Sequence, residues 1–402
     1  MSVLVWIRAV SLIALLPGVS WAQGVVRLQR GDTLVLRTTG PGRWGPPKRA
    51  VELRRLSGPR DQEEFGRIDC ISALPDGGVV VYDAKGLDGP TLFVINADGT
   101  TRRTLGRLGA GPGEYRATQL TTCLAVQADG TILFLDTGNS RIDRWGAKGE
   151  VLPAIPLSAI PVGPEPNLLA GANGSIYVRA GLGRPRRQFV PWHTDFSAFG
   201  FLHLSPSGAV LDTVHAQRTW RDYQVPREFD PWDVTLPFED GTLFISGADR
   251  LAFLLRSRVG RDVLVEHPTD PVPVTAAERK EWTAIRGWYQ GSVPPPAPSF
   301  ANTKSAFFAV ARAHDGTIWL RLHVAAVRDT PREAFPGVKD PPSPIREWFE
   351  SPVFAAFLVD GTFLGEAQLP LHSRMHVFAG AFAWGIAVAP DGQETLVRWR
   401  VR

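Results

Sequence analysis

The sequence predicts an all-β protein built from repeated four-stranded antiparallel sheets. The first observation is a recurring unit, in which alternating apolar residues lead through a glycine turn into a second β-rich run. The second is a dispersed excess of turn-forming residues, with 40 glycines and 34 prolines in 402 residues. The third is the content of 44% hydrophobic and 21% charged residues, which supplies a core and argues against global disorder.

Short turns define the repeat. An Asp-Gly pair between two β-rich runs indicates a hairpin, and we interpret these turns as type I′, in which both central residues have positive φ. The turns lie at Asp76-Gly77, Asp129-Gly130, Asn173-Gly174, Asp240-Gly241 and Asp315-Gly316, with Ala379-Gly380 as a weaker sixth. Six such units at variable spacing predict a six-bladed β-propeller whose blades carry loop insertions.

The turns also set the blade boundaries. The expected blades are residues 68–106, 123–155, 168–216, 232–266 and 305–369, and a sixth made of 375–389 and 395–402. We expect residues 50–56 to supply the outer strand of the sixth blade, so that both ends of the chain close the ring and remove exposed sheet edges. Phe65, Tyr115 and Phe229 each follow a glutamate, and we expect these aromatic rings to wedge between blades.

The first 22 residues have the pattern of a secretory signal peptide. Arg8 supplies a short positive region, residues 10–16 are apolar, and Pro17-Gly18 precedes a small-residue end at Ala22. The alternative is an uncleaved anchor helix, which needs roughly 20 unbroken apolar residues. No Cys follows the cleavage position, so we expect no stable membrane anchor after cleavage. The mature chain, residues 23–402, is expected to be one secreted or periplasmic domain and a monomer.

The charge of the chain is close to balanced. The 44 basic and 40 acidic residues leave a net charge of +4, mixed along the sequence. This charge gives no electrostatic argument for a nucleic acid or a membrane surface as partner. Because an exported protein also does not meet nucleic acid in the ordinary course, we exclude that partner.

Two segments resemble a known repeat. DGTILFLDTGNSRIDRWGAKGE, residues 129–150, is similar to an NHL repeat, and GRLGAGPGEY, residues 106–115, is similar to the loop that joins consecutive repeats. The whole chain resembles exported bacterial six-bladed β-propeller proteins of the NHL and TolB-like type. The match is strong over residues 68–155, fair to residue 216 and only positional beyond. The resemblance therefore implies the fold more firmly than the function.

Three insertions indicate where a ligand binds. Residues 181–199, 267–304 and 327–350 all fall on connections at one face of the expected propeller, and binding residues concentrate on loops held by a rigid scaffold. The second insertion contains a predicted helix, because Thr275 and Glu278 form a capping box and Val274, Trp282 and Ile285 give the helix an apolar side. This helix is either a lid or, as we favour, a packed buttress.

Arginine next to aromatic residues marks the candidate binding residues, since both types are enriched at binding hot spots. The candidates are Arg184, Arg187, Trp192, His193, Arg221, Tyr223, Trp288 and Arg321. The alternative is that the aromatic side chains fill blade interfaces. His193 and Asp195 could also act as a base and its orienting carboxylate, although a surface hydrogen bond is the more common outcome.

Signals for chemistry are few, and no catalytic residue or cofactor is predicted. No G-x-S-x-G motif occurs. His372 and His376 have the spacing of a helical zinc pair, but no helix pattern surrounds them and the motif's glutamate is missing. Cys70 and Cys123 take equivalent places on neighbouring inner strands, and whether they form a disulfide stays open.

The expected function is an exported binding scaffold for a protein, peptide or carbohydrate ligand. The resemblance implies an alternative, a metal-dependent hydrolase or lyase of the lactonase or amidating-lyase type, with a divalent metal at the channel mouth. Its conceivable ligands are Asp83, Asp136, Asn139, His193 and His323. A structural component of the cell envelope is a third hypothesis.

Overall fold

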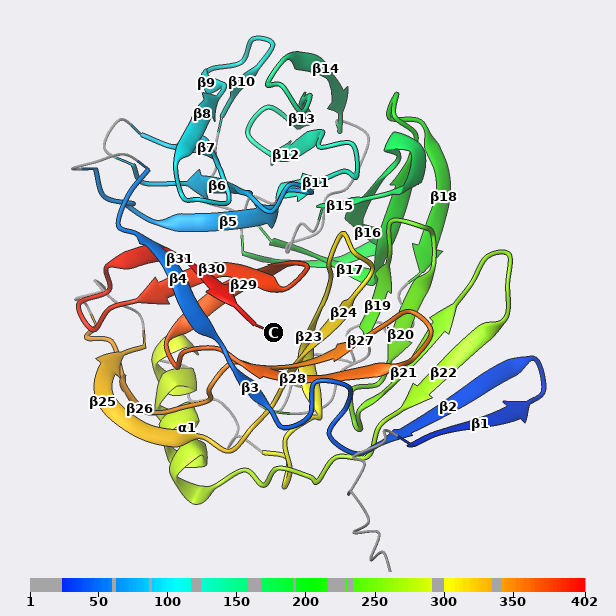
Figure 1. The fold of residues 1–402 in the computed structure, drawn as a ribbon. Coiled ribbons are helices and arrows are strands. Elements are labelled where there is room, and N and C mark those ends of the chain that lie inside the picture. Colours follow the sequence, from blue (N-terminus) through cyan, green and yellow to red (C-terminus); the bar gives the residue numbers. More distant parts are fainter. Residues whose placement is uncertain are drawn as a thin grey trace, which may run out of the picture.

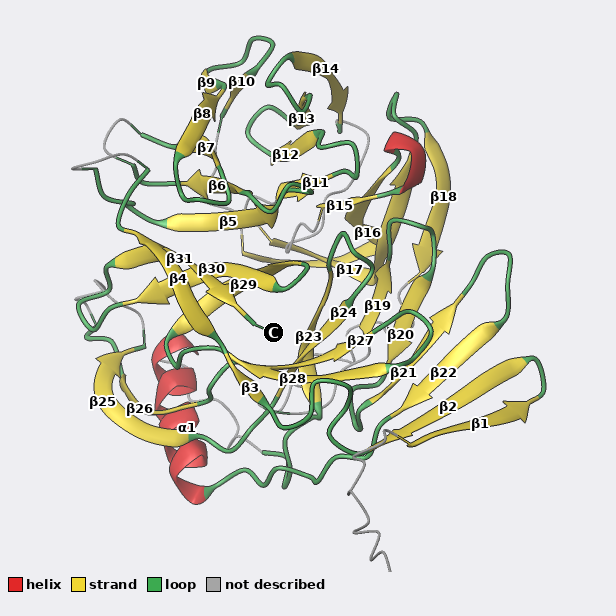
Figure 2. Cartoon of the chain, viewed as in Figure 1, coloured by secondary structure: helices red, strands yellow, loops and turns green. Residues whose placement is uncertain are grey.

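The computed structural model describes residues 24–59, 63–86, 89–116, 124–157, 168–190, 193–215, 229, 234–290, 300–334 and 341–401. Over these residues the chain forms six blade sheets arranged radially around a central axis (Figure 1), together with two two-stranded sheets, and strands dominate the structure (Figure 2). The predicted six-bladed β-propeller is therefore confirmed. None of the described helices is both long enough and apolar enough to cross a membrane. The predicted signal peptide lies outside the described residues.

The first three blades follow the predicted boundaries, each with its strands in chain order. Blade one contains β5 (Ile68–Ala73), β6 (Val79–Asp83), β7 (Thr91–Ile95) and β8 (Thr101–Leu105). Blade two contains β11 (Leu124–Val126), β12 (Ile132–Asp136), β13 (Arg141–Trp145) and β14 (Val151–Pro156). Blade three contains β15 (Leu168–Ala170), β16 (Ile176–Val190), β17 (His193–Leu204) and β18 (Val210–His215). A short parallel pair, β9 (Arg107–Leu108) and β10 (Glu114–Tyr115), connects blades one and two.

The other three blades also keep their expected places. Blade four contains β19 (Val234–Pro237), β20 (Leu243–Ser246), β21 (Ala252–Arg256) and β22 (Asp262–Glu266). Blade five contains β23 (Phe307–Arg312), β24 (Ile318–Leu322), β27 (Val353–Phe357) and β28 (Phe363–Gln368). Blade six contains β29 (Ser373–Ala379), β30 (Phe382–Val388), β31 (Glu394–Arg400) and, as predicted, β4 (Val51–Leu56) as its outer strand, antiparallel to β31.

The N-terminal segment adds three strands that the sequence did not predict. The hairpin of β1 (Gly24–Arg30) and β2 (Thr33–Thr39) extends blade four, because β2 pairs in parallel with β22. The two-residue strand β3 (Lys48–Arg49) pairs in parallel with β28 of blade five. Residues 24–56 therefore run along the outer edges of three successive blades (Figure 1).

Most Asp-Gly turns are three-residue loops, so the expectation of type I′ turns is wrong for them. At Asp76-Gly77 the Gly77 amide donates to Leu74 O at 3.0 Å, and only the glycine has positive φ, at 86°. This is a type I turn followed by a left-handed glycine. Asp76 Oδ1 accepts from the Gly78 amide at 3.0 Å, which stabilises the turn without placing the aspartate in the left-handed region.

The turn at Asn173-Gly174 differs from the others. Within the 3₁₀ turn η1 (Ala172–Gly174), Asn173 has φ 55° and Gly174 has φ 77°, as the predicted type I′ turn requires. At the sixth turn Gly380 alone has positive φ, at 59°, between the paired residues Ala379 and Phe382.

Six clusters of buried apolar side chains lie between neighbouring blades and form the core of the ring. The cluster between blades six and one joins the two halves of the closure, because it contains Trp384, Ile386 and Leu396 from blade six together with blade-one residues. Phe65 lies in that cluster and Tyr115 lies in the one between blades one and two, so these two aromatics wedge between blades as expected.

The three insertions lie on connections between the second and third strands of a blade or between blades. The first continues β16 and β17 as a long hairpin. The second contains the predicted helix α1 (Ala276–Gln290), and the third forms the hairpin of β25 (Val327–Glu333) and β26 (Ile345–Phe349). In an antiparallel blade these connections share one face, here called the insertion face.

Helix α1 packs against the β25–β26 hairpin as a buttress. The predicted capping box forms, because the Thr275 amide donates to Glu278 Oε2 at 2.9 Å and the Glu278 amide donates to Thr275 Oγ1 at 3.2 Å. Further along the helix, Glu281 Oε2 accepts from the Glu347 amide at 2.6 Å and from the Trp348 amide at 3.1 Å. The helix is thus fixed to the insertion next to it.

Candidate functional site

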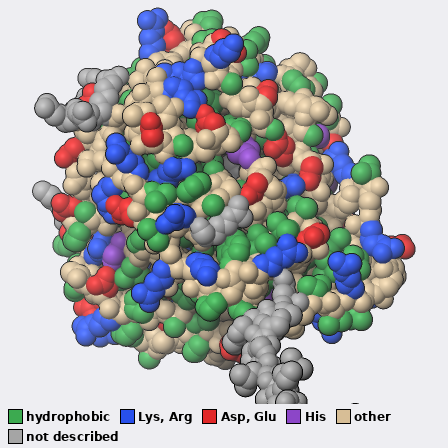
Figure 3. Space-filling model, viewed as in Figure 1, with side chains coloured by type: hydrophobic (Ala, Val, Ile, Leu, Met, Phe, Trp, Pro, Cys, Tyr) green, Lys and Arg blue, Asp and Glu red, His purple; other side chains and the backbone are tan. Residues whose placement is uncertain are grey.

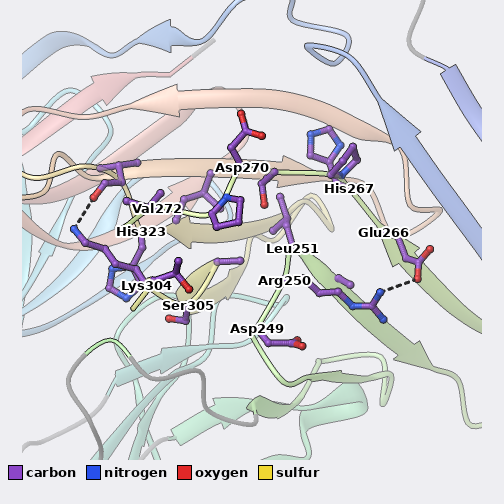
Figure 4. A pocket seen from close by; sticks show the side chains of 18 of the residues that line it. Asp249, Arg250, Leu251, Glu266, His267, Asp270, Val272, Lys304, Ser305 and His323 are labelled. Carbon is purple, nitrogen blue, oxygen red and sulfur yellow. Dashed lines mark hydrogen bonds and ion pairs between the residues drawn. The ribbon is translucent and has the colours of Figure 1, made fainter. Parts of the chain in front are cut away.

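A cavity of about 720 Å³ opens between blades four and five at the insertion face. Its walls come from three connections: the loop after β20, the segment after β22, and the loop after β24. The end of β2 and residues 303–306 complete it. Figure 4 shows Lys304, Ser305 and His323 on one side of the cavity and Arg250, Glu266 and His267 on the other.

Glu366 of β28 lines this cavity without a partner. Its carboxylate makes no hydrogen bond or ion pair with any described residue, although the side chain is half-buried. Burial raises the pKa of Glu366, since nothing compensates for the lost hydration of the charged form. A positive charge on a ligand next to Glu366 therefore stabilises the ionised form of this carboxyl group.

Ser305 supplies a second unpartnered group in the cavity wall. The residue is 3% exposed, and its hydroxyl makes no hydrogen bond within the described part of the chain. Its backbone is fixed, because the Ser305 amide donates to Phe229 O at 2.9 Å. Buried hydroxyl groups are normally hydrogen-bonded, so this unsatisfied one can accept a hydrogen bond from a ligand when its side chain turns into the cavity.

His267 stands where blade four continues into the insertion. Its Nδ1 lies 2.8 Å from the buried hydroxyl of Thr38, and its ring packs on Phe363 with 4.1 Å between the ring centres. Burial lowers the pKa of His267, which keeps the ring neutral at physiological pH. Nε2 makes no hydrogen bond with the described residues and is the second ring position that a ligand can use.

A buried cation connects the cavity wall to helix α1. Lys304 Nζ lies 2.5 Å from Glu278 Oε1, 2.8 Å from Glu350 Oε1 and 2.8 Å from Val324 O, and its side chain is 0% exposed. His323 Nδ1 lies 3.0 Å from Glu350 Oε2. Burial opposes ionisation of Glu350, but the contacts from His323 and Lys304 outweigh it and lower its pKa. These four residues are called the Lys304 network below.

The rim of the cavity carries charges of both signs. Arg37 Nε and Arg250 Nη1 lie 2.7 and 3.4 Å from the carboxylate oxygens of Glu266. The hydrogen bond from Arg37 lowers the pKa of Glu266, so this carboxylate is ionised and paired. Asp249 and Asp270 are exposed and make no ion pair with the described residues. Charges of both signs are similarly mixed on the face shown in Figure 3.

The predicted binding residues do not gather at this cavity. Arg184 and Arg187 lie on β16 and His193 lies on β17, but their side chains are outside what the structure describes. Trp192, Arg221 and Tyr223 lie outside the described residues altogether. Their proposed role stays a prediction.

Trp288 and Arg321 are described, and neither lines the cavity. Trp288 Nε1 donates to Pro341 O at 3.1 Å, so the ring ties helix α1 to the third insertion. The guanidinium of Arg321 lies over the Phe308 ring at 4.8 Å. Burial lowers the pKa of Arg321, and the nearby charge of Glu350 opposes that effect.

The residues considered as metal ligands have structural partners. Asp83 accepts from the Gly66, Arg67 and Lys85 amides, and Asp136 accepts from the Arg116 and Asn139 amides. Each carboxylate therefore fixes the chain that enters its blade. Among the described residues, no group of three or more His, Cys, Asp and Glu side chains is placed to hold a metal ion.

His372 and His376 also have separate partners. His372 Nε2 lies 2.7 Å from Asp329 Oδ2, whereas His376 Nε2 lies 2.9 Å from Ser373 Oγ. Both histidines lie beside or on strand β29 rather than on a helix. Cys123 lies outside the described residues, so its pairing with Cys70 stays open.

Sequence reasoning missed Ser305, His267 and Glu366, because each comes from a different segment and none belongs to a motif. The signal that could have found Glu366 is its place in FLGEAQ, where it is the one charged residue in a mostly buried strand. His267 is the first residue of the second insertion, directly after β22. Ser305 has no such signal.

Comparisons with known proteins agree with the fold. No protein-family model and no curated protein sequence matches this chain. A member of the DUF4221 family from Bacteroides vulgatus is similar in structure, with a TM-score of 0.50 and 8% identity over 88% of this chain and 98% of that one.

Two enzymes of known structure also align with the chain. The virginiamycin B lyase of Staphylococcus aureus has a TM-score of 0.38 and 12% identity over 88% of this chain and 99% of that one. A gluconolactonase from Xanthomonas campestris has a TM-score of 0.39 and 13% identity over 87% and 98% of the two chains. With TM-scores below 0.5 at 12–13% identity, these two alignments carry no inference about the fold or the activity of this chain.

Proposed function

We propose that this protein is an exported binding propeller that takes a protein, peptide or carbohydrate ligand at its insertion face, with the cavity between blades four and five as the anchor point. Export rests on the signal-peptide pattern of residues 1–22. Membership of the NHL and TolB-like type rests on the repeat-like segment 129–150 and stays part of the same proposal.

One observation carries this proposal: a cavity of about 720 Å³ at the insertion face contains buried polar groups that the described residues leave without partners. Its volume is within the range of ligand pockets, which are concave, largely preformed and supplied with a few convergent polar groups. The Lys304 network and the α1 buttress hold two of its walls in place. A preformed wall lowers the entropic cost of binding.

The metal-dependent hydrolase or lyase has no ligand set of three residues among the described side chains. Asp83 and Asp136 already accept hydrogen bonds from backbone amides, and their oxygens would have to give these up to bind a metal. We therefore propose the binding function as the one that the geometry supports best.

The test is a screen of the purified mature protein on peptide and glycan arrays, followed by titration of the strongest ligands. Thr269→Trp places a bulky ring at an exposed position of the cavity lining, and Val259→Trp places the same ring on a fully exposed turn remote from the cavity. We expect the first variant to abolish binding and the second to leave it unchanged. Equal binding by both variants, or no ligand at all, would contradict the proposal.

A further inference from the structure

The basic side chains that line the cavity have ion-pair partners, whereas several of its acidic side chains have none among the described residues. Each basic side chain in its lining already has acidic partners: Arg37 and Arg250 pair with Glu266, and Lys304 pairs with Glu278 and Glu350. None of these cations pairs with Glu366. The rim carboxylates of Asp249 and Asp270 likewise have no ion-pair partner among the described residues.

A half-buried carboxylate without a counter-charge disfavours its own ionised form, and a cation brought next to it removes that penalty. An anionic ligand would add negative charge to a cavity whose basic groups are already paired. A neutral ligand would leave Glu366 uncompensated. The electrostatics therefore favour a positively charged group on the ligand.

The hydroxyl of Ser305 is an independent observation that points to a ligand. It is 3% exposed, lines the same cavity and has no partner in the described structure (Figure 4). An ammonium group donates up to three hydrogen bonds and accepts none, so it is suited to a carboxylate together with a hydroxyl oxygen. The lining carries both kinds of acceptor and no unpaired basic side chain among its described residues.

We propose that the cavity between blades four and five binds an organic cation, the protonated amine of a lysine side chain in a peptide ligand, with Glu366 as its counter-ion and Ser305 as a second acceptor. This inference rests on the proposed binding function and names the ligand chemistry of the same site. Asp249 and Asp270 at the rim attract the cation toward the cavity.

The experiment is isothermal titration of the full mature protein with end-blocked Gly-Lys-Gly, with the same peptide acetylated on its lysine amine, and with free cadaverine. We expect the lysine peptide to bind and the acetylated peptide not to bind. If free cadaverine binds more weakly than the lysine peptide, the result supports a peptide, rather than a free amine, as the ligand. Cadaverine that binds more tightly overturns the peptide assignment.

The variant series isolates the counter-ion. Glu366→Gln keeps the shape of the side chain and removes its charge, and we expect it to weaken binding of the lysine peptide by at least about tenfold. Ser305→Ala is expected to weaken it less. Glu150→Gln, which removes one charge from an exposed residue of blade two, is the matched control and should bind like the wild type. Circular dichroism of each variant checks that the fold is kept.

The failures are distinguishable. If Glu366→Gln binds the lysine peptide within about twofold of the wild type, or the acetylated peptide binds as well as the free amine, the cation assignment is wrong. The same holds if no cationic probe binds at about 10 mM. In either case, an array ligand that Thr269→Trp blocks and Glu366→Gln does not would leave the binding function standing.

Discussion

Replacing Lys304 with methionine tests the Lys304 network directly. The substitution keeps a long apolar side chain and removes a cation whose side chain is 0% exposed. It leaves the carboxylates of Glu278 and Glu350, with side-chain exposures of 3% and 17%, close together and without their shared partner. Breaking a buried ion pair by removing one member costs about 3–5 kcal/mol, and we expect a loss of that size in the free energy of unfolding at pH 7.

The loss should depend on pH with a defined sign. The pKa of Glu350 in the folded wild type is lowered, so its stabilising contribution is present above the unfolded-state value near 4.5 and is lost as the pH falls through the folded-state value. In Lys304→Met the part of that contribution that comes from Lys304 is lost at neutral pH, while His323 still contacts Glu350. The difference in unfolding free energy between the two proteins should therefore be largest near pH 7 and should narrow below pH ~4.5.

Urea unfolding followed by tryptophan fluorescence measures this difference. Lys280→Met makes the same substitution on an exposed position of the same helix and should change the unfolding free energy by no more than about 0.5 kcal/mol. The triple change Glu278→Gln, Lys304→Met, Glu350→Gln removes the stranded charges and should recover much of the loss. A Lys304→Met protein within about 1 kcal/mol of the wild type at pH 7 would refute the reasoning.

Three further outcomes are expected. Burial, helped by the charge of Arg321, lowers the pKa of His376 to about 3, so between pH ~6.5 and ~3 the unfolded chain binds a proton that the folded chain does not. The contribution of His376 to the unfolding free energy should therefore decrease by about 1.4 kcal/mol for each unit by which the pH falls in this range. A His376→Gln protein whose unfolding free energy has the same pH slope would contradict this. Deleting residues 395–402 removes β31 from between β30 and β4 and should give insoluble protein, whereas a soluble, cooperatively folded product would show that the closure is not needed. Asp136→Ala removes a 0% exposed acceptor from two backbone amides and should lower the unfolding free energy by about 2–3 kcal/mol in urea titration, and a change below about 0.5 kcal/mol would show that these bonds do not matter.

The blade order could be predicted from the sequence because the turn glycines repeat along the chain. Each Asp-Gly pair fixes where a first strand ends and a second begins, and the apolar alternation then places the remaining strands. The turn type could not be fixed in the same way, since a left-handed glycine serves both a type I′ turn and a type I turn with a bulge. The position of the aspartate decides between them, and Asp76 prefers to accept a hydrogen bond from Gly78.

The N-terminal strands and the cavity were not predictable, for different reasons. Strand β1 is exposed along its whole length, so its sequence carries no buried face to recognise. The cavity depends on which connections meet between blades four and five, and sequence order does not show that Glu366, His267 and Ser305 face one space. The insertions were predictable because their lengths interrupt the repeat.

The path of residues 24–56 has a consequence for how the molecule assembles. These residues are synthesised well before their partners, which are residues 262–266, 367–368 and 396–400. Arg55 bonds to Thr395, which lies 340 residues further along the chain. Such distant contacts are slow to form, and strands that wait for them are open to wrong association. We therefore expect residues 24–56 to pair with blades four, five and six only after those blades have formed. This pairing is then the slow step of folding.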